Sequence, residues 1–140
     1  MNPMVRSILA VVAGMLVAFV LIVCVEMIGM RVYPPPTDMD PRNIESIKSA
    51  MARIPLGAML FVLLAYTVGS VAGGWVAARF APSAGLSHAM FVAALLFGAG
   101  LMNLMTVPHP VWFWVASSAI YFLGAWSGAQ AAGARSTATA

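Results

Sequence analysis

The feature that most constrains this chain is the length of its uncharged stretches. Residues 80–134 contain no Asp, Glu, Lys or Arg, and the same is true of residues 54–78 and 7–25. One helical crossing of a bilayer takes about 20 residues, because the hydrocarbon core is about 30 Å thick. The longest stretch is too long for one crossing and suits two with a turn between them. The pattern therefore predicts four membrane spans.

The composition excludes the other broad classes of protein. Charged residues make up 8% of the 140 residues, hydrophobic residues make up 62%, and the mean hydropathy is +0.95. A soluble domain carries about 25% charged residues, and a disordered chain combines low hydrophobicity with high net charge. We therefore expect a single integral membrane domain of the all-α class, folded as a four-helix transmembrane bundle.

Prolines and polar residues mark the ends of the expected spans. The spans are predicted at residues 7–30, 56–78, 86–106 and 111–132. Three successive prolines at residues 34–36 end the first span, because proline cannot continue a helix. The small, polar tail over residues 134–140 is expected to fray.

The loop after the first span carries its own helical pattern over residues 41–53. Four apolar side chains share one helical face there, namely Ile44, Ile47, Met51 and Ile54. This arrangement predicts a short amphipathic helix, with Asp40 as its N-cap and Pro41 as its first residue. The helix either lies on the membrane surface or packs on the other spans.

The charge balance indicates which partners this chain has. The net charge is +3, and basic residues border the spans, where they are expected in membrane proteins. No basic stripe remains to bind phosphates, so we expect the lipid bilayer as the partner and no nucleic acid. Four spans place both termini on one side of the membrane. We expect that side to be cytoplasmic, because the acidic, proline-rich loop of residues 31–53 has the character of an exported loop.

Small residues recur at every fourth position in three of the predicted spans. Helices in lipid associate through close backbone approach at such residues, since lipid offers no hydrophobic drive between helices. We expect this packing role for five glycines: Gly14, Gly69, Gly73, Gly124 and Gly128. They pack the four helices of one monomer, or the pair Gly124 and Gly128 joins a homo-oligomer or a membrane-protein partner.

Glu26 is the only charged residue inside a predicted span. A carboxylate near the centre of a span costs on the order of 2.5–3.5 kcal/mol. Glu26 lies about 6 Å before the expected end of the first span, so it either reaches the interface or forms a proton or cation site. A polar site in that half of the bundle would include Asn103, His109 and Tyr121.

No motif indicates an enzyme. The sequence has no Gly-rich phosphate loop, no nucleophile paired with a base and no paired carboxylates in a span. His88 and His109 are 21 residues apart, which is about 30 Å in a helix, and the eleven methionines are scattered along the chain. We therefore expect no catalytic residue, no metal and no cofactor.

Three segments stand out when they are taken together. They are Arg6-Ser-Ile-Leu-Ala-Val-Val-Ala-Gly14, Pro34-Pro-Pro36 followed by Glu45-Ser-Ile-Lys48, and Asn103-x-Met105-x-x-Pro108-x-Pro110-x-Trp112-Phe113. The pattern covers nearly the whole chain and resembles a family of uncharacterised small four-span membrane proteins of bacteria. The resemblance implies a multi-pass protein of the bacterial inner membrane with a four-helix layout. It implies no activity.

A shorter segment, Val25-Glu26-Met27-Ile28-Gly29, resembles the first-helix glutamate motif of the small multidrug resistance transporters. Those transporters are four-helix proteins of similar size, and the resemblance implies that Glu26 couples protons to export. The chain departs from that family in three respects. Glu26 lies near a span end, a long loop follows the span, and the other binding aromatics of those transporters have no match in this sequence.

Two functions follow as expectations. The first is a non-enzymatic accessory or structural membrane component. The alternative is a small proton-coupled transporter or channel that uses Glu26. A water-accessible cavity that reaches Glu26 favours transport, and a dry, packed interior favours the accessory role.

Overall fold

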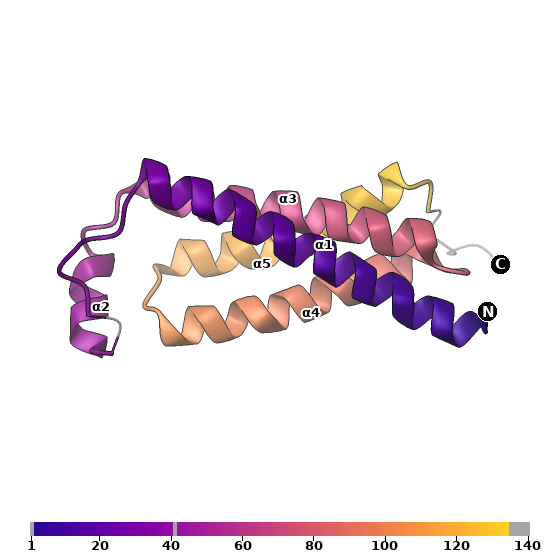
Figure 1. Cartoon of the computed structure of the whole chain (residues 1–140), viewed down its shortest axis with the longest axis horizontal. Coiled ribbons are helices and arrows are strands. Elements are labelled where there is room, and N and C mark those ends of the chain that lie inside the picture. Colours follow the sequence, from indigo (N-terminus) through magenta and orange to yellow (C-terminus); the bar gives the residue numbers. More distant parts are fainter. Residues whose placement is uncertain (1, 41, 135–140) are drawn as a thin grey trace.

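The computed structural model describes residues 2–40 and 42–134 and is all-helical over those ranges. Its helices are α1 (Pro3–Val32), α2 (Ile44–Met51), α3 (Leu56–Phe80), α4 (Gly85–Thr106) and α5 (Val111–Ala131). The four long helices run side by side along one axis, and α2 lies at the end opposite the N-terminus (Figure 1). The all-α prediction is therefore confirmed for the described residues.

Three helices in the described part of the chain are long and apolar enough to cross a membrane, namely α1, α3 and α4. The sequence predicted four such helices. The remaining long helix, α5, has 21 residues and no charged side chain. Its hydropathy is lowered by three serines, a glutamine, three tryptophans and a tyrosine.

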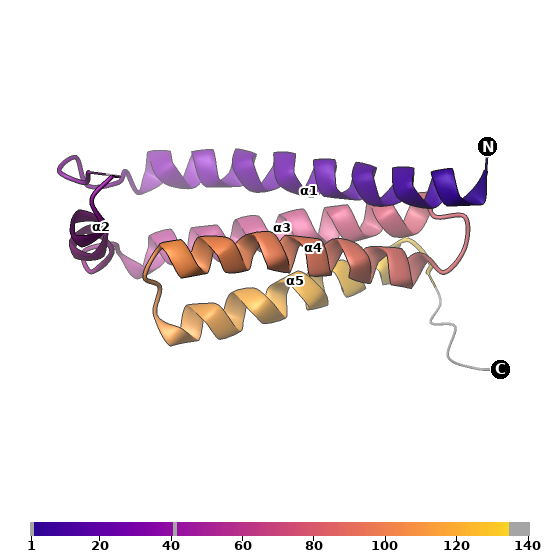
Figure 2. The same ribbon diagram turned by 90° about the horizontal axis from the view of Figure 1, so that it is seen from below.

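Helix α3 is the centre of the bundle. It packs against α1, α4 and α5, whereas α1 packs chiefly on α3 and to a lesser extent on α4. Figure 2 shows α1 as the outer helix, with α5 on the opposite side of α3 and α4. This arrangement leaves much of the surface of α1 free for lipid.

Two adjacent glycines explain how α3 receives a helix on each side. A Cβ added at Gly73 would lie 2.7 Å from the carbonyl oxygen of Gly14 in α1, so these two backbones touch. A Cβ added at Gly74 would lie 2.6 Å from the carbonyl oxygen of Ala125 in α5. Successive residues of a helix point about 100° apart, so neighbouring glycines open two different faces of α3.

The loop helix begins later than the sequence indicated, and the prediction of Asp40 as its N-cap was wrong. The side-chain oxygen of Asn43 accepts hydrogen bonds from the backbone N–H groups of Glu45 and Ser46, at 3.0 and 3.4 Å. Because the Asn43 side chain satisfies both of these N–H groups, the helix starts at Ile44. The carboxylate of Asp40 instead accepts a hydrogen bond from the backbone of Arg42, at 2.9 Å. The expected first residue, at position 41, lies outside the described residues.

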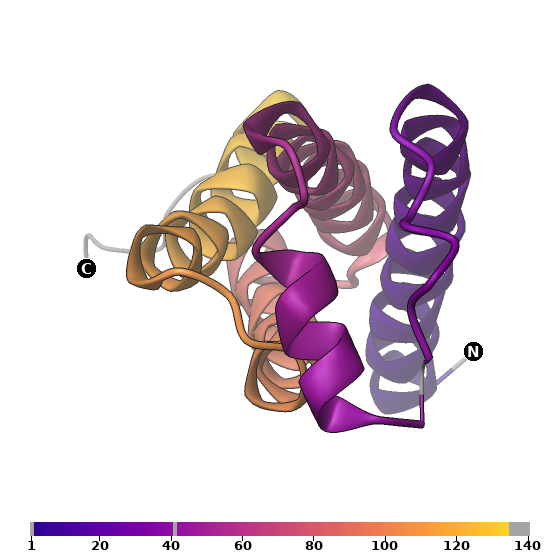
Figure 3. The same ribbon diagram turned by 90° about the vertical axis from the view of Figure 1, so that its left-hand side faces the viewer.

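Helix α2 lies across the end of the bundle (Figure 3). Ala50 is fully buried, and Ile47 and Met51 are half-buried, whereas Ile44 at the start of the helix is exposed. One side of α2 is therefore turned towards the bundle.

The long helices α3, α4 and α5 begin and end close to the expected residues, while α1 is longer at both ends. Of the tail that was expected to fray, residues 135–140 lie outside the described residues.

Candidate functional site

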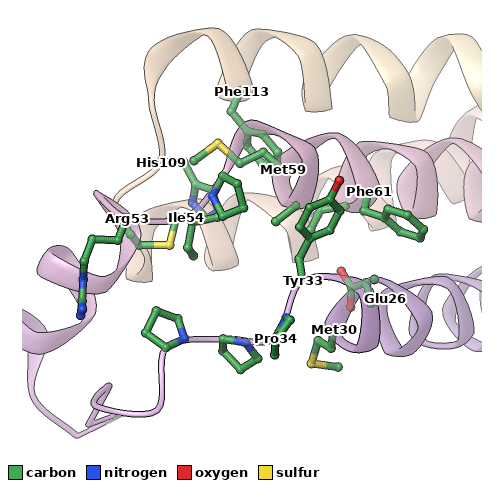
Figure 4. A pocket seen from close by; sticks show the side chains of 17 residues that line it. Glu26, Met30, Tyr33, Pro34, Arg53, Ile54, Met59, Phe61, His109 and Phe113 are labelled. Carbon is green, nitrogen blue, oxygen red and sulfur yellow. The ribbon is translucent and has the colours of Figure 1, made fainter.

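A cavity of about 380 Å³ lies at the α2 end of the bundle. Its walls come from the end of α1, the prolines that follow it, the end of α2 and the turn after it, the start of α3, and the turn before α5 with the first turn of α5 (Figure 4). Most of the lining is apolar or aromatic. The polar side chains that reach it are those of Glu26, Tyr33, Arg53 and His109.

The sequence of α1 explains why its last turns line this cavity. Glu26, Gly29, Met30 and Tyr33 follow one another at intervals of three, one and three residues, and all four belong to the wall. Residues at such spacings share one face of a helix. Phe61 of α3 packs on Gly29, where an added Cβ would lie 2.9 Å from its ring. A glycine one turn after the glutamate therefore makes room for an aromatic ring beside it.

Glu26 lies further from the end of its helix than the sequence indicated. Helix α1 continues to Val32, so Glu26 stands six residues, or about 9 Å along the axis, before its end. Its side chain is half-buried and faces the cavity together with Tyr33 and Phe61 (Figure 4). Within the part of the chain that the structure describes, no hydrogen bond or ion pair engages this carboxylate. Glu26 therefore presents an unpaired acid to a mostly apolar space.

His109 lines the same cavity from the turn that precedes α5. Its Nδ1 lies 2.8 Å from the carbonyl oxygen of Val107, and its ring stacks on Phe113 with a centroid distance of 4.7 Å. These two contacts hold the ring against the cavity wall. Two of the four predicted site residues, Glu26 and His109, thus share one cavity.

Asn103 and Tyr121 do not line the cavity but meet in a polar layer behind it. The amide of Asn103 donates a hydrogen bond of 3.4 Å to the hydroxyl of Tyr66, and the ring of Tyr66 stacks on that of Tyr121 at 5.0 Å. The structure therefore groups two predicted residues, Asn103 and Tyr121, around a tyrosine that the prediction omitted.

Tyr66 is the residue that sequence reasoning missed. It is buried on α3 and joins Asn103 of α4 to Tyr121 of α5. Tyrosines of membrane helices are expected near the membrane interfaces, whereas Tyr66 stands near the middle of a 25-residue helix. A phenol at that depth needs a polar partner, and this requirement is the signal that could have found it.

The predicted packing glycines lie inside the bundle. Gly14, Gly69 and Gly73 are buried between α1 and α3, and Gly124 and Gly128 are buried between α3 and α5. A Cβ at Gly128 would collide with the carbonyl oxygen of Val71. The face of α5 that carries Gly124 and Gly128 is thus covered by α3 of the same chain.

An ion pair joins the two ends of the segment that carries α2 over the cavity. One terminal nitrogen of Arg53 contacts both carboxylate oxygens of Asp38, at 3.0 and 2.9 Å, and Nε of Arg53 donates to the carbonyl oxygen of Ser49 at 3.3 Å. The Arg53 guanidinium lowers the pKa of the Asp38 carboxyl from its ordinary value. The pair ties the chain before α2 to the chain after it, which holds α2 over the bundle end.

Over the described residues, no group of three His, Cys, Asp or Glu side chains is arranged to hold a metal ion. The polar part of the cavity lining consists of one acid, one guanidinium, one imidazole and one phenol, and the rest is apolar. No protein-family model, no curated protein and no solved structure matches the chain.

Proposed function

We propose that the protein is a small proton-coupled transporter of the bacterial inner membrane, and that Glu26 binds either a proton or an amphipathic cation. The observation that carries the proposal is an unpaired carboxylate on the wall of a mostly apolar, aromatic-lined cavity. In this proposal Glu26 and His109 line the cavity, and Asn103 and Tyr121 join Tyr66 in the polar layer behind it. The chain has four spans, and both termini face the cytoplasm.

The position of α5 supports the fourth span. Helix α5 packs along α3, which is long and apolar enough to cross a membrane, and the two backbones touch at several levels. A helix packed along a membrane-spanning neighbour shares its depth. Its few hydroxyl groups bond back to carbonyl oxygens of the same helix, as Ser118 does to Trp114 at 2.6 Å, so they tolerate an apolar environment.

The chemistry of the cavity supports a cation with an apolar body as the ligand. A carboxylate without a partner in an apolar space is costly, and a proton or a bound cation relieves that cost. Aromatic rings attract cations through their faces, and Tyr33 and Phe61 lie on the same wall as Glu26. The cavity volume of about 380 Å³ is in the range of small-molecule sites.

One carboxylate that serves two ligands also supplies a coupling mechanism. A proton on Glu26 removes the charge that holds the cation, so the two ligands exclude each other at one site. Release of a proton on one side of the membrane then allows the cation to bind there. Access from both sides of the membrane requires a second arrangement of the helices.

The test is uptake of tetraphenylphosphonium into proteoliposomes driven by a pH gradient. We expect Glu26→Gln to abolish uptake, because the amide can neither exchange a proton nor hold a cation. Glu26→Asp keeps the charge and is expected to retain part of the uptake. The matched control is Glu45→Gln, since Glu45 is exposed on α2 and does not line the cavity. Unchanged uptake in Glu26→Gln would overturn the proposal.

The second candidate is the accessory or structural membrane component. The observation that favours it is the close packing of the bundle half away from α2, where α3 touches α1 at Gly73 and α5 at Gly74. A bundle of this kind serves as a rigid partner for other membrane helices. This function is indicated if the wild-type protein neither binds nor moves tetraphenylphosphonium under any pH gradient.

A further inference from the structure

A second hollow lies at the other end of the bundle, on the outer surface between α1 and α4. Its volume is about 530 Å³. Seven side chains line it: Ser7, Ile8, Val11, Val12, Ser87, His88 and Phe91. We call this hollow the α1/α4 groove. It shares no residue with the Glu26 cavity, so whatever occupies it is independent of the proposed transport.

The polarity of the α1/α4 groove changes along its length. Ser7 stands near the start of α1, and Ser87 and His88 stand in the first turn of α4, so the polar groups gather at the helix ends. The apolar side chains follow one to two turns deeper in the membrane, as with Val12 and Phe91. A polar mouth above an apolar floor matches a lipid that lies parallel to the helices, with its headgroup at the surface.

The charge at this end favours an anionic headgroup. Arg6 and Arg79 are exposed there, and Nε of Arg6 donates a hydrogen bond of 3.1 Å to the carbonyl oxygen of Phe80, which ties the start of α1 to the end of α3. All four acidic residues of the chain lie in the other half of α1 or in the loop that follows it. Over the described residues, the charged side chains at this end of the bundle are therefore basic, which favours a phosphate at the mouth of the groove.

We propose that the α1/α4 groove is a binding site for an anionic phospholipid. The acyl chain lies against Val11, Val12 and Phe91, and the phosphate lies between the hydroxyls of Ser7 and Ser87, with His88 beside it. Nδ1 of His88 lies 3.1 Å from the carbonyl oxygen of Ala84, and this contact holds the ring at the mouth of the groove. The guanidinium of Arg6 supplies the positive charge at that end.

The test compares two lipids with the same acyl chains on the full-length protein in detergent. Phosphatidylglycerol and phosphatidylcholine are added, and the retained lipid is counted by native mass spectrometry. We expect a preference for phosphatidylglycerol of about tenfold or more, the factor that corresponds to one charge-assisted hydrogen bond. Equal retention of the two lipids would overturn the proposal.

Two variants locate the site, each with a matched control. The double variant Arg6→Gln with His88→Gln is expected to lose the preference, whereas Arg31→Gln, at the other end of α1, keeps it. Val12→Trp fills the groove and is expected to reduce retention of both lipids, whereas Leu16→Trp, on an exposed part of α1 outside the groove, does not. A preference that survives both groove variants would place the lipid elsewhere and overturn the proposal. Glu26→Gln leaves the preference unchanged, which separates this site from the transport site.

Discussion

The two halves of the bundle use glycine in opposite ways. In the half away from α2, glycines meet the backbone of the next helix, as Gly14 does at Gly73 and Gly128 does at Val71. In the half next to α2, glycines meet aromatic rings: Gly29 meets Phe61, Gly57 meets Tyr33, and Gly100 meets Tyr121.

This difference explains where the cavity lies. Two backbones in contact leave no space between the helices, so the first half is closed. A ring that packs on a glycine holds the two helices apart by its own width. In the second half such rings stand around Glu26 and leave about 380 Å³ open. Residue size at a few positions thus decides which half is sealed between its helices and which has an internal cavity.

The largest expected effect is that of adding a methyl group in the sealed half. In Gly128→Ala, the new Cβ falls on the carbonyl oxygen of Val71 and lies 2.8 Å from the backbone nitrogen of Trp75. Backbone atoms cannot rotate away, so α3 and α5 must separate. We expect the free energy of unfolding to fall by about 2 kcal/mol or more, measured by denaturation in mixed micelles.

The control for that variant is Gly98→Ala, another helical glycine, where an added Cβ meets nothing within 4 Å. Alanine favours the helix over glycine by about 1 kcal/mol, so this variant should be as stable as the wild type or more so. Equal losses in the two variants would show that close backbone contact does not seal this half.

A smaller effect is expected from the same change in the open half. In Gly29→Ala, the new Cβ lies 2.9 Å from Cδ1 of the Phe61 ring. The ring borders the cavity and can turn into it, so we expect a loss of no more than about 1 kcal/mol. The displaced ring takes ligand space, and binding of tetraphenylphosphonium should weaken. A loss of stability as large as that of Gly128→Ala would contradict the contrast between the halves.

The smallest effect on overall stability is expected from Asp38→Asn in the loop over the cavity. Both partners of the Asp38–Arg53 pair are exposed, so the pair adds little to global stability and the melting temperature should not change. Locally, loss of the pair frees α2, and we expect faster hydrogen exchange of its amides. Glu45→Gln, on α2 itself, is the control.

The same pair predicts a dependence on pH. Because Arg53 lowers the pKa of Asp38, the ion pair is complete above the ordinary carboxyl pKa of about 4. It is lost as the pH falls through the lowered value. Protection of α2 in the wild type should therefore decline in acid and become equal to that of Asp38→Asn. Protection that is the same in both proteins at neutral pH would show that the pair does not hold the loop.

Helix starts were predictable from the sequence where a proline stands before them. Helices α3 and α5 begin at Leu56 and Val111, as expected, with Pro55 and Pro110 in the capping position. Proline has no N–H to offer a preceding turn, so it sets this boundary by local chemistry alone. The start of α2 was not predictable in this way. Asp40 and Asn43 are both good capping residues, and the contacts of the folded loop, including that between Asp40 and Ser46, favoured Asn43.

Part of the candidate site was also predictable from the sequence, and part was not. That Glu26 and His109 belong to one end of the bundle followed from counting helices, because every second connection lies on the same side. The role of Tyr66 did not follow, since the direction in which a side chain of a uniformly apolar helix points depends on its neighbours. Gly100 decides part of this, because only a residue without a Cβ leaves room for the hydroxyl of Tyr121.

The sequence by itself determined the all-helical class and the approximate limits of each long helix. It also singled out Glu26 as the one acid in an apolar stretch, because charge and proline act locally and are visible without a fold. Only the tertiary structure decided that Glu26 borders a cavity, that Tyr66 joins Asn103 and Tyr121 behind it, and that the opposite half is sealed. These properties depend on which faces of the helices meet, and helices with apolar residues on every side carry no amphipathic pattern that specifies this.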